Sequence, residues 1–302
     1  MKRLGIDLGG TKIAVAVLDE RGEIALQRRI DTPREQYHAT LDSIAGLITA
    51  AERELGEHCS IGVGTPGAVS PTTGLLRNAN STWLNFKPFK TDLEQRLGRE
   101  IRVANDANCF SLSEASDGAA SDADVVFGVI LGTGVGGGLV VNKRLVIGVN
   151  AIGGEWGHNP LPAPQPDELP GPDCYCGRRG CIENWLAGPA LERDFAQRFG
   201  ERLTADAIAA RAAEGDVHAE SALHRYEERL ARSLAHVINI VDPDAIVLGG
   251  GLSNIERLYR SVPVMWTEHV FSDHVATRLL PPLHGDAGGV RGAAWLWLAD
   301  GS

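Results

Sequence analysis

The sequence lacks the features that define several large classes of protein. Among its 302 residues, no apolar run approaches the roughly 18 residues that a membrane-spanning helix needs, so we expect no membrane insertion. The first residues are basic, but Asp7 interrupts the following apolar stretch, and we expect no export signal. Positive charge is also scarce. Lys and Arg number 29 against 39 Asp and Glu, and the net charge of −10 argues against nucleic-acid and anionic-membrane binding.

Cysteine is too scarce and too unevenly spaced for a secreted disulfide framework. Three of the five cysteines, Cys174, Cys176 and Cys181, lie within eight residues, and His158 precedes the first of them by sixteen residues. One His and three Cys are a ligand set of closed tetrahedral zinc sites. We therefore predict a structural Zn²⁺ site in a protein of the reducing cytoplasm. The alternative is a group of free buried thiols.

Glycine, by contrast, is abundant, with 36 residues, and three runs stand out. Gly9-Gly10 and Gly132–Gly138 each separate two expected strands, and Gly249–Gly251 follows another. Glycine allows backbone N–H groups to approach a phosphate closely. The second run contains the G-x-G-x-x-G pattern, but a strand follows it rather than a helix, so we reject a Rossmann dinucleotide site. An ordinary tight turn is the alternative at each run, and three mirrored runs together favour phosphate binding.

The apolar pattern predicts two α/β halves that each begin with a strand, a glycine turn and a strand. The predicted strands are 3–8, 13–18, 23–30, 61–64, 101–104, 125–131, 139–142, 145–148 and 245–248. The predicted helices are 36–55, 222–241 and 290–298. Small polar residues at 117–122 mark the boundary between the halves. Residues 160–173 hold six of the fifteen prolines and predict a surface loop.

Several polar side chains are candidates for a binding site. Asp106 ends a buried strand and suits a general base for a substrate hydroxyl, with a helix N-cap as the alternative. Glu155 and Glu183 flank the predicted metal ligands and suit sugar hydroxyls, with solvated surface charge as the alternative. Zinc on one ring nitrogen of His158 would leave the other for a ligand. Asp7 suits a water-mediated contact to magnesium.

These motifs occur together and in order, and on them the chain resembles the ROK family of sugar kinases and repressors. The resemblance covers the whole chain and implies an α/β fold, namely the two-domain actin-like ATPase (ribonuclease H-like) fold with an interdomain cleft. It implies one domain of residues 1–118 plus about 288–302, and a larger domain of 119–287 with the zinc loop. Residues 78–85, 155–161 and 289–297 look most similar to the bacterial fructokinase (mannofructokinase) branch.

The resemblance implies that ATP and Mg²⁺ phosphorylate the 6-hydroxyl of D-fructose, with mannose as a possible second acceptor, and that Asp106 is the base. The implied sugar-binding residues are Asn80, Asn105, Asp106, Glu155, His158 and Glu183. The implied nucleotide-binding residues are Asp7, Gly9, Gly10, Thr11, Lys12, Gly132, Thr133, Gly134, Gly136, Gly249, Gly250 and Gly251. The implied zinc ligands are His158, Cys174, Cys176 and Cys181. We expect a cytoplasmic homodimer that binds hexose and ATP.

Other functions stay open at this point. Glucose, mannose and N-acetylated hexosamines are alternative acceptors within the same family. A sugar-responsive repressor would carry a DNA-binding helix-turn-helix before the sugar domain, but the first predicted strand begins at residue 3, and the negative charge disfavours DNA. A sugar sensor without catalysis is a further alternative, and the presence of Asp106 and of both glycine turns argues against it.

Overall fold

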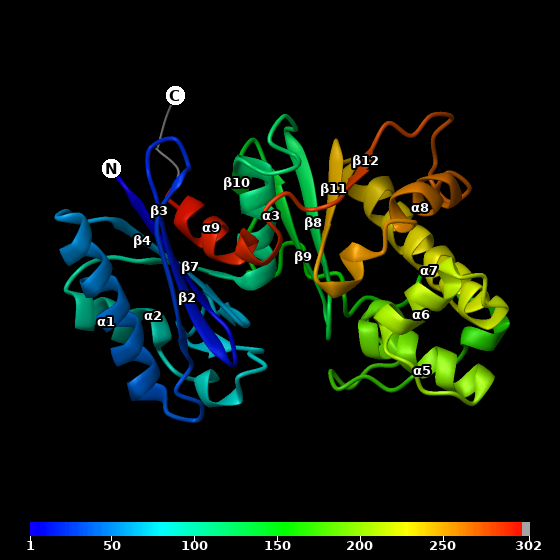
Figure 1. Ribbon diagram of the computed structural model, residues 1–302, viewed down its shortest axis with the longest axis horizontal. Helices are drawn as coiled ribbons and strands as arrows, with labels where there is room; N and C mark the ends of the chain where they lie inside the picture. Colours follow the sequence, from blue (N-terminus) through cyan, green and yellow to red (C-terminus); the bar gives the residue numbers. More distant parts are fainter. Residues whose placement is uncertain (298–302) are drawn as a thin grey trace. The chain divides into compact units, whose positions relative to one another are not determined.

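The chain forms two compact units, shown in a computed structural model that describes residues 1–297 (Figure 1). Unit 1 comprises residues 1–121, residues 138–153 and the segment that begins at Leu283, and unit 2 comprises residues 122–137 and 154–282. The first division, after Ser121, lies in the small polar segment at 117–122. Residues 138–153 belong to unit 1, whereas the expected domains placed them in the second domain.

The elements of the two units follow one another with short connections. The strands are β1 (Arg3–Leu8), β2 (Lys12–Leu18), β3 (Ile24–Asp31), β4 (Ser60–Thr65), β5 (Ala68–Val69), β6 (Leu76–Arg77), β7 (Arg102–Asn105), β8 (Val125–Leu131), β9 (Val135–Val141), β10 (Arg144–Leu145), β11 (Ala245–Gly249) and β12 (Arg278–Leu280). The α-helices are α1 (Tyr37–Leu55), α2 (Phe89–Leu97), α3 (Asp106–Ser116), α4 (Glu183–Leu186), α5 (Gly188–Phe199), α6 (Ala205–Ala213), α7 (Val217–Val241), α8 (Leu258–Trp266) and α9 (Gly288–Trp295).

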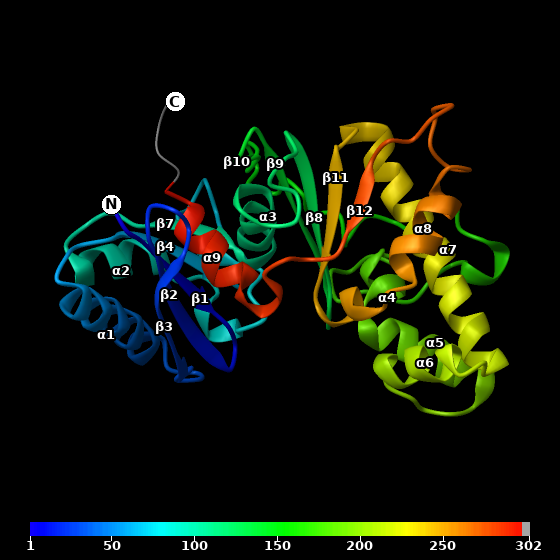
Figure 2. The same ribbon diagram turned by 45° about the horizontal axis from the view of Figure 1, so that its top comes forward.

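Unit 1 is built on a five-stranded sheet in the order β3-β2-β1-β4-β7. β1 pairs antiparallel with β2 and parallel with β4, and β4 pairs parallel with β7. Figures 1 and 2 show α1 and α2 on one face of this sheet and α9 on the other. Large apolar side chains of β1, such as Leu4 and Ile6, belong to the core that includes Ile44 and Ile48 of α1. This layer holds the carboxyl ends of β1 and β7 at one edge of the sheet.

The opposite face of the sheet carries small residues because α9 packs directly on it. A Cβ added to Gly5 would lie 2.0 Å from the carbonyl oxygen of Val290, and one added to Gly62 would lie 1.8 Å from that of Ala293. Such distances leave no room for any side chain. The alternation of large and small residues along β1 therefore decides which helix covers which face.

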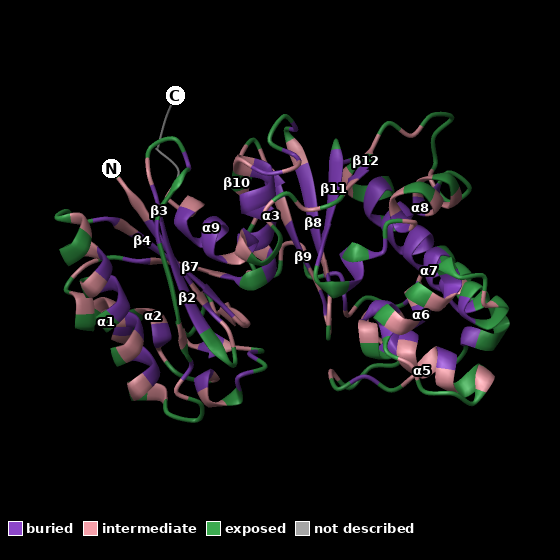
Figure 3. Cartoon of the chain, in the orientation of Figure 1, coloured by how far each residue is buried: buried purple, intermediate pink, exposed green. Residues whose placement is uncertain are grey.

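Unit 2 contains most of a second five-stranded sheet in the order β10-β9-β8-β11-β12, and the division between the units falls within β9. β11 pairs in parallel with both β8 and β12. The helix α7 contacts α5, α6 and α8, and its buried face includes Leu223, Leu230 and Leu234. Figure 3 shows the continuous burial of β11 and the buried stripe along α7.

The expected strands and helices agree with these elements except at several boundaries. β9 begins at Val135, so the glycine turn predicted for Gly132–Gly138 is limited to its first three residues. The later glycines are strand residues that let neighbours approach, since a Cβ on Gly137 would lie 2.7 Å from the carbonyl oxygen of Gly154. β10 ends at Leu145, short of the predicted 145–148. Helices α5, α6 and α8 were not predicted.

The described residues contain no helix that is long and apolar enough to cross a membrane.

Candidate functional site

Two carboxylates of unit 1 lie at neighbouring strand ends. Asp7 is the fifth residue of β1, and Asp106 directly follows β7. Burial raises the pKa of Asp7 to about 6, repulsion from the carboxylate of Asp106 raises it further, and the charge of Arg29 opposes both effects. Removal from water also raises the pKa of Asp106, against hydrogen bonds from backbone N–H groups. Asp106 is nevertheless an exposed residue, so a ligand can reach it.

The helix cap next to Asp106 is provided by Asn105. The Asn105 Oδ1 accepts the backbone N–H of Asn108 at 2.7 Å, and Asp106 is the first residue of α3. The N-cap alternative weighed for Asp106 therefore belongs to its neighbour. Asp106 Oδ1 accepts the N–H of Ala107 at 2.8 Å, and the positive end of the helix dipole lies at this carboxylate.

The first glycine turn of unit 1 joins β1 to β2. The Gly9 N–H donates to the carbonyl oxygen of Lys12 at 2.9 Å and closes the turn. A Cβ on Gly10 would lie 3.2 Å from Ser81 Oγ, so the loop that contains the exposed Asn80 passes beside this turn. The Lys12 ammonium pairs with Asp31 at 2.6 Å. Lys12 therefore already has a carboxylate partner, which any phosphate would have to displace.

One residue that positions the Asn80 loop was not singled out from the sequence. Asn85 Oδ1 accepts the Ala79 N–H at 2.8 Å, and Asn85 Nδ2 donates to the Ala79 carbonyl at 3.0 Å. This double bond to one backbone residue holds the loop immediately before Asn80. The signal in the sequence was only that Asn85 ends the polar cluster of residues 78–85.

The second and third glycine runs meet in unit 2. The N–H of Gly188 donates to the carbonyl oxygen of Gly132 at 2.8 Å and ties the turn after β8 to the start of α5. Gly250 has a φ of +80°, and a Cβ there would lie 2.5 Å from the carbonyl oxygen of Leu131 and 3.1 Å from the nitrogen of Gly132. A side chain at position 250 is excluded by both its backbone conformation and this contact.

Glu183 is connected to the second glycine turn, a link that the sequence did not reveal. It is the first residue of α4, and its Oε2 accepts the N–H of Val135 at 3.0 Å. A Cβ on Gly134 would lie 2.7 Å from the same oxygen, so glycine is required for this approach. Glu155, the other flanking carboxylate, is exposed.

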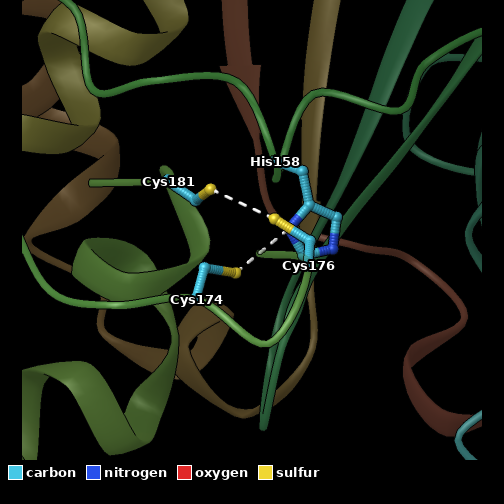
Figure 4. Close-up of side chains that lie close together, drawn as sticks. All are labelled: His158, Cys174, Cys176 and Cys181. Carbon is cyan, nitrogen blue, oxygen red and sulfur yellow. Dashed lines mark hydrogen bonds between the residues drawn. The ribbon is translucent and has the colours of Figure 1, made fainter. Parts of the chain in front are cut away.

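The predicted metal ligands come together in unit 2 (Figure 4). The ligand atoms of His158, Cys174, Cys176 and Cys181 all lie within 4.8 Å of one another. Cys176 Sγ lies 3.7 Å from Cys181 Sγ, and Cys174 Sγ lies 3.5 Å from His158 Nδ1. Zinc bonds of about 2.3 Å to sulfur and about 2.0 Å to nitrogen, at tetrahedral angles, give separations of about 3.8 and 3.5 Å. The cluster therefore fits a closed tetrahedral zinc site.

Tyr175, between two of the cysteines, is a further residue at this cluster. Its hydroxyl lies 2.9 Å from His158 Nε2, and the two rings meet edge to face. The second ring nitrogen, which the sequence analysis assigned to a ligand, thus has a protein partner in this structure. Tyr175 is 81% exposed, so this partner is on the surface and can be displaced.

The paired carboxylates, glycine turns and His/Cys cluster, on an α/β fold of two units, define a sugar kinase of the actin-like ATPase class. Residues 3–300 match the ROK family, and the chain belongs to that family. An N-acetyl-D-glucosamine kinase of Escherichia coli O6:H1 is 41% identical over 300 residues, 98% of this chain and 99% of that protein.

Two solved structures show the same similarity. The ROK hexokinase of Thermus thermophilus matches with a TM-score of 0.87 and 32% identity, over 98% of this chain and 97% of its own. A ROK family glucokinase of Streptomyces griseus, solved with glucose and AMPPNP, matches with a TM-score of 0.76 and 28% identity, over 97% and 98% of the two chains.

The prediction of the fructokinase branch is wrong. The similar curated relatives that match almost the whole chain are N-acetyl-D-glucosamine kinases, from E. coli and also from Salmonella gallinarum at 41% identity. The residues at 78–85, 155–161 and 289–297 identify the family but not its branch. The physical reason is that closely related hexoses are distinguished by small differences in pocket shape, which short motifs do not encode.

Proposed function

We propose that this chain is an N-acetyl-D-glucosamine kinase that transfers the γ-phosphoryl group of ATP to the 6-hydroxyl of the sugar. The observation that carries the proposal is the 41% identity, over 98% of the chain, to a kinase of that name. The exposed carboxylate of Asp106 at a helix N-terminus supports it, because phosphoryl transfer to a sugar needs a base at the attacking hydroxyl.

In this proposal Asp106 accepts the proton of the 6-hydroxyl as the oxygen attacks the γ-phosphorus. Its raised pKa makes it a better proton acceptor than an ordinary aspartate. Asp7 holds Mg²⁺ through water, and bound Mg²⁺ supplies positive charge to the phosphates. A magnesium ion beside Asp7 would also favour the charged form of a carboxyl whose pKa is about 6 without it.

The sugar hydroxyls in this proposal bind to Asn80, Asn105, Glu155, His158 and Glu183. Zinc held by Nδ1 of His158 and by the three cysteines is structural, since four protein ligands leave no open position. Its contribution is to fix the direction of His158 Nε2, from which a sugar hydroxyl displaces the exposed Tyr175.

The phosphates of ATP bind, in this proposal, to the backbone N–H groups of two glycine turns. The first contains Gly9, Gly10, Thr11 and Lys12, and the second contains Gly132, Thr133, Gly134 and Gly136. Gly249, Gly250 and Gly251 lie on the adenosine side. The contact of Gly250 with the start of the second turn supports this arrangement. Occupation of the turn by phosphates also orients Glu183, which is bonded to Val135.

The compartment and the assembly belong to the same proposal. Cysteines that bind zinc must remain unoxidised, which is consistent with the cytoplasm. The family resemblance implies a homodimer, and light scattering of the purified protein measures its mass directly.

The test is ATP consumption by the zinc-loaded protein with Mg²⁺ and one sugar at a time. The sugars are N-acetyl-D-glucosamine, N-acetyl-D-mannosamine, glucose, mannose and fructose. We expect the highest kcat/KM with N-acetyl-D-glucosamine. A clear preference for glucose would keep the chemistry and overturn the acceptor. No turnover with any sugar, from folded protein, would overturn the proposed activity and favour a sensor.

A further inference from the structure

A buried carboxylate near the end of α3 has no part in the site described so far. Glu114 is completely buried, and its two oxygens accept three backbone N–H groups. Oε2 accepts the N–H of Ala119 at 2.9 Å and that of Leu283 at 3.0 Å, and Oε1 accepts the N–H of His284 at 3.2 Å. A buried charge is costly unless it is paired in this way.

These three bonds hold two segments at which the chain passes between its units. The chain leaves unit 1 after Ser121, close to Ala119, and returns to unit 1 at Leu283. The two segments are more than 160 residues apart in sequence but share one carboxylate. Gly118 permits the first segment to wrap around it, because a Cβ there would lie 2.4 Å from Glu114 Oε2.

A second set of contacts ties the same segments to α9. Asp117 Oδ1 lies 3.1 Å from His284 Nε2, and Asp117 also pairs with Arg291 of α9. The helices α3 and α9 touch closely, since a Cβ on Gly292 would lie 1.6 Å from the carbonyl oxygen of Cys109. Glu114 is thus fixed within a rigid pair of helices, one of which begins with Asp106.

We propose that Glu114 is a positioning residue for phosphoryl transfer. Its carboxylate fixes both chain passages to the helix that presents Asp106, so the catalytic base keeps a constant relation to the residues that follow each passage. The inference rests on the proposed kinase activity, in which the base is in unit 1 and the second and third glycine runs are in unit 2. A misplacement of reacting groups by about 1 Å can reduce a rate by about 100-fold, so such fixing has a measurable effect.

The variant Glu114→Gln tests this role. A glutamine accepts at one of the two oxygen positions and presents an N–H₂ group at the other, where a backbone N–H also points. The matched control is Glu52→Gln on α1, because Glu52 is also mostly buried and also accepts a backbone N–H, that of Cys59 at 2.8 Å. Glu52 pairs with Arg99 and contacts neither passage through these bonds.

For Glu114→Gln we expect kcat to fall about tenfold or more while the KM for the sugar changes by less than about threefold. We also expect more ADP than sugar phosphate, because loosely aligned groups let water compete as acceptor. Hydrogen exchange at the amides of residues 119, 283 and 284 should become faster. Glu52→Gln should keep kcat, the one-to-one ratio of products and the exchange at these amides.

Equal kcat and equal product ratios in the two folded variants would overturn the inference. If Glu114→Gln does not fold, Glu114→Asp replaces it, since it keeps the charge and shortens the side chain by one methylene. If the wild-type protein phosphorylates no hexose, the proposed function fails, and the exchange experiment still decides the clamp. Unchanged exchange at the three amides would then refute it.

Discussion

Replacement of Glu168 by glutamine should destabilise unit 2 strongly, although Glu168 belongs to a proline-rich loop. Its side chain is only 5% exposed and lies against α7. Glu168 Oε1 accepts Arg229 Nε at 2.8 Å and Arg232 Nη2 at 2.9 Å, and Oε2 accepts the Gln165 N–H at 2.7 Å. Removal of one partner from a buried ion pair costs about 3–5 kcal/mol.

The lower end of that range applies here, because both arginines keep another partner. Arg229 remains 3.3 Å from Asp194, and Arg232 remains bonded to the carbonyl oxygen of Ala163. We therefore expect the free energy of unfolding to fall by about 3 kcal/mol. At about 2–4 °C per kcal/mol for a unit of this size, the Tm should fall by about 6–12 °C.

The control for this experiment is the adjacent residue. Asp167 carries the same charge but pairs with Arg198 at the surface, and its side chain is 58% exposed. Exposed pairs contribute about 0–1 kcal/mol, so Asp167→Asn should change the Tm little. Thermal unfolding with dye-detected zinc release measures both variants, and the loop before Cys174 should release zinc earlier in Glu168→Gln. Equal Tm values for the two variants would refute the reasoning.

Three further changes test the site. Asp106→Asn should reduce kcat by about 10²–10⁴ with little change in the KM of the sugar, as expected for loss of a general base, and a near-normal kcat would remove that role. Asp7 should titrate near pH 6 by NMR without Mg²⁺, and its pKa should fall on addition of Mg²⁺ or in Asp106→Asn, since a cation or loss of repulsion favours the carboxylate; a pKa indifferent to both would contradict the described interaction. Gly134→Ala should raise the KM for ATP at least about tenfold, because its Cβ would lie 2.7 Å from Glu183 Oε2, and an unchanged KM would separate this turn from the nucleotide.

The pH dependence of stability gives a check on the Glu168 cluster. Burial acts to raise the pKa of Glu168, but the bonds from Arg229 and from the Gln165 backbone outweigh it, and the pKa lies below its usual value. A lowered pKa stabilises the fold above the unfolded value of about 4.3, and this stabilisation is lost as the pH falls through the folded value. The difference in stability between the wild-type protein and Glu168→Gln should therefore shrink below about pH 4. A constant difference down to pH 3, measured by urea unfolding, would contradict it.

Local patterns in the sequence were sufficient for most of unit 1 and for the metal cluster. Alternating apolar residues along β1 and the three-to-four spacing on α1 reflect faces that each element buries against its neighbour. The His/Cys ligand set was visible because metal coordination restricts residue type far more than packing does. Its geometry agrees with that prediction at the level of 3.5 and 3.7 Å separations.

Contacts between distant segments were not predictable from these patterns. Glu168 and Arg229 are 61 residues apart, and Glu114 and Leu283 are 169 apart, so no periodicity connects them. The bond from Val135 to Glu183 escaped notice for the same reason. The prediction of the acceptor sugar failed differently, because it depended on short segments that the family shares rather than on the shape of a pocket.

The most direct measurement of the central claim is the structure of the product. The wild-type protein and Asp106→Asn are incubated with ATP, Mg²⁺ and N-acetyl-D-glucosamine, and the product is examined by phosphorus–proton NMR. We expect a sugar phosphate whose phosphorus couples to the protons on carbon 6, formed by the wild-type protein and almost absent with the variant. Phosphate on another hydroxyl, or equal product from both proteins, would contradict the account.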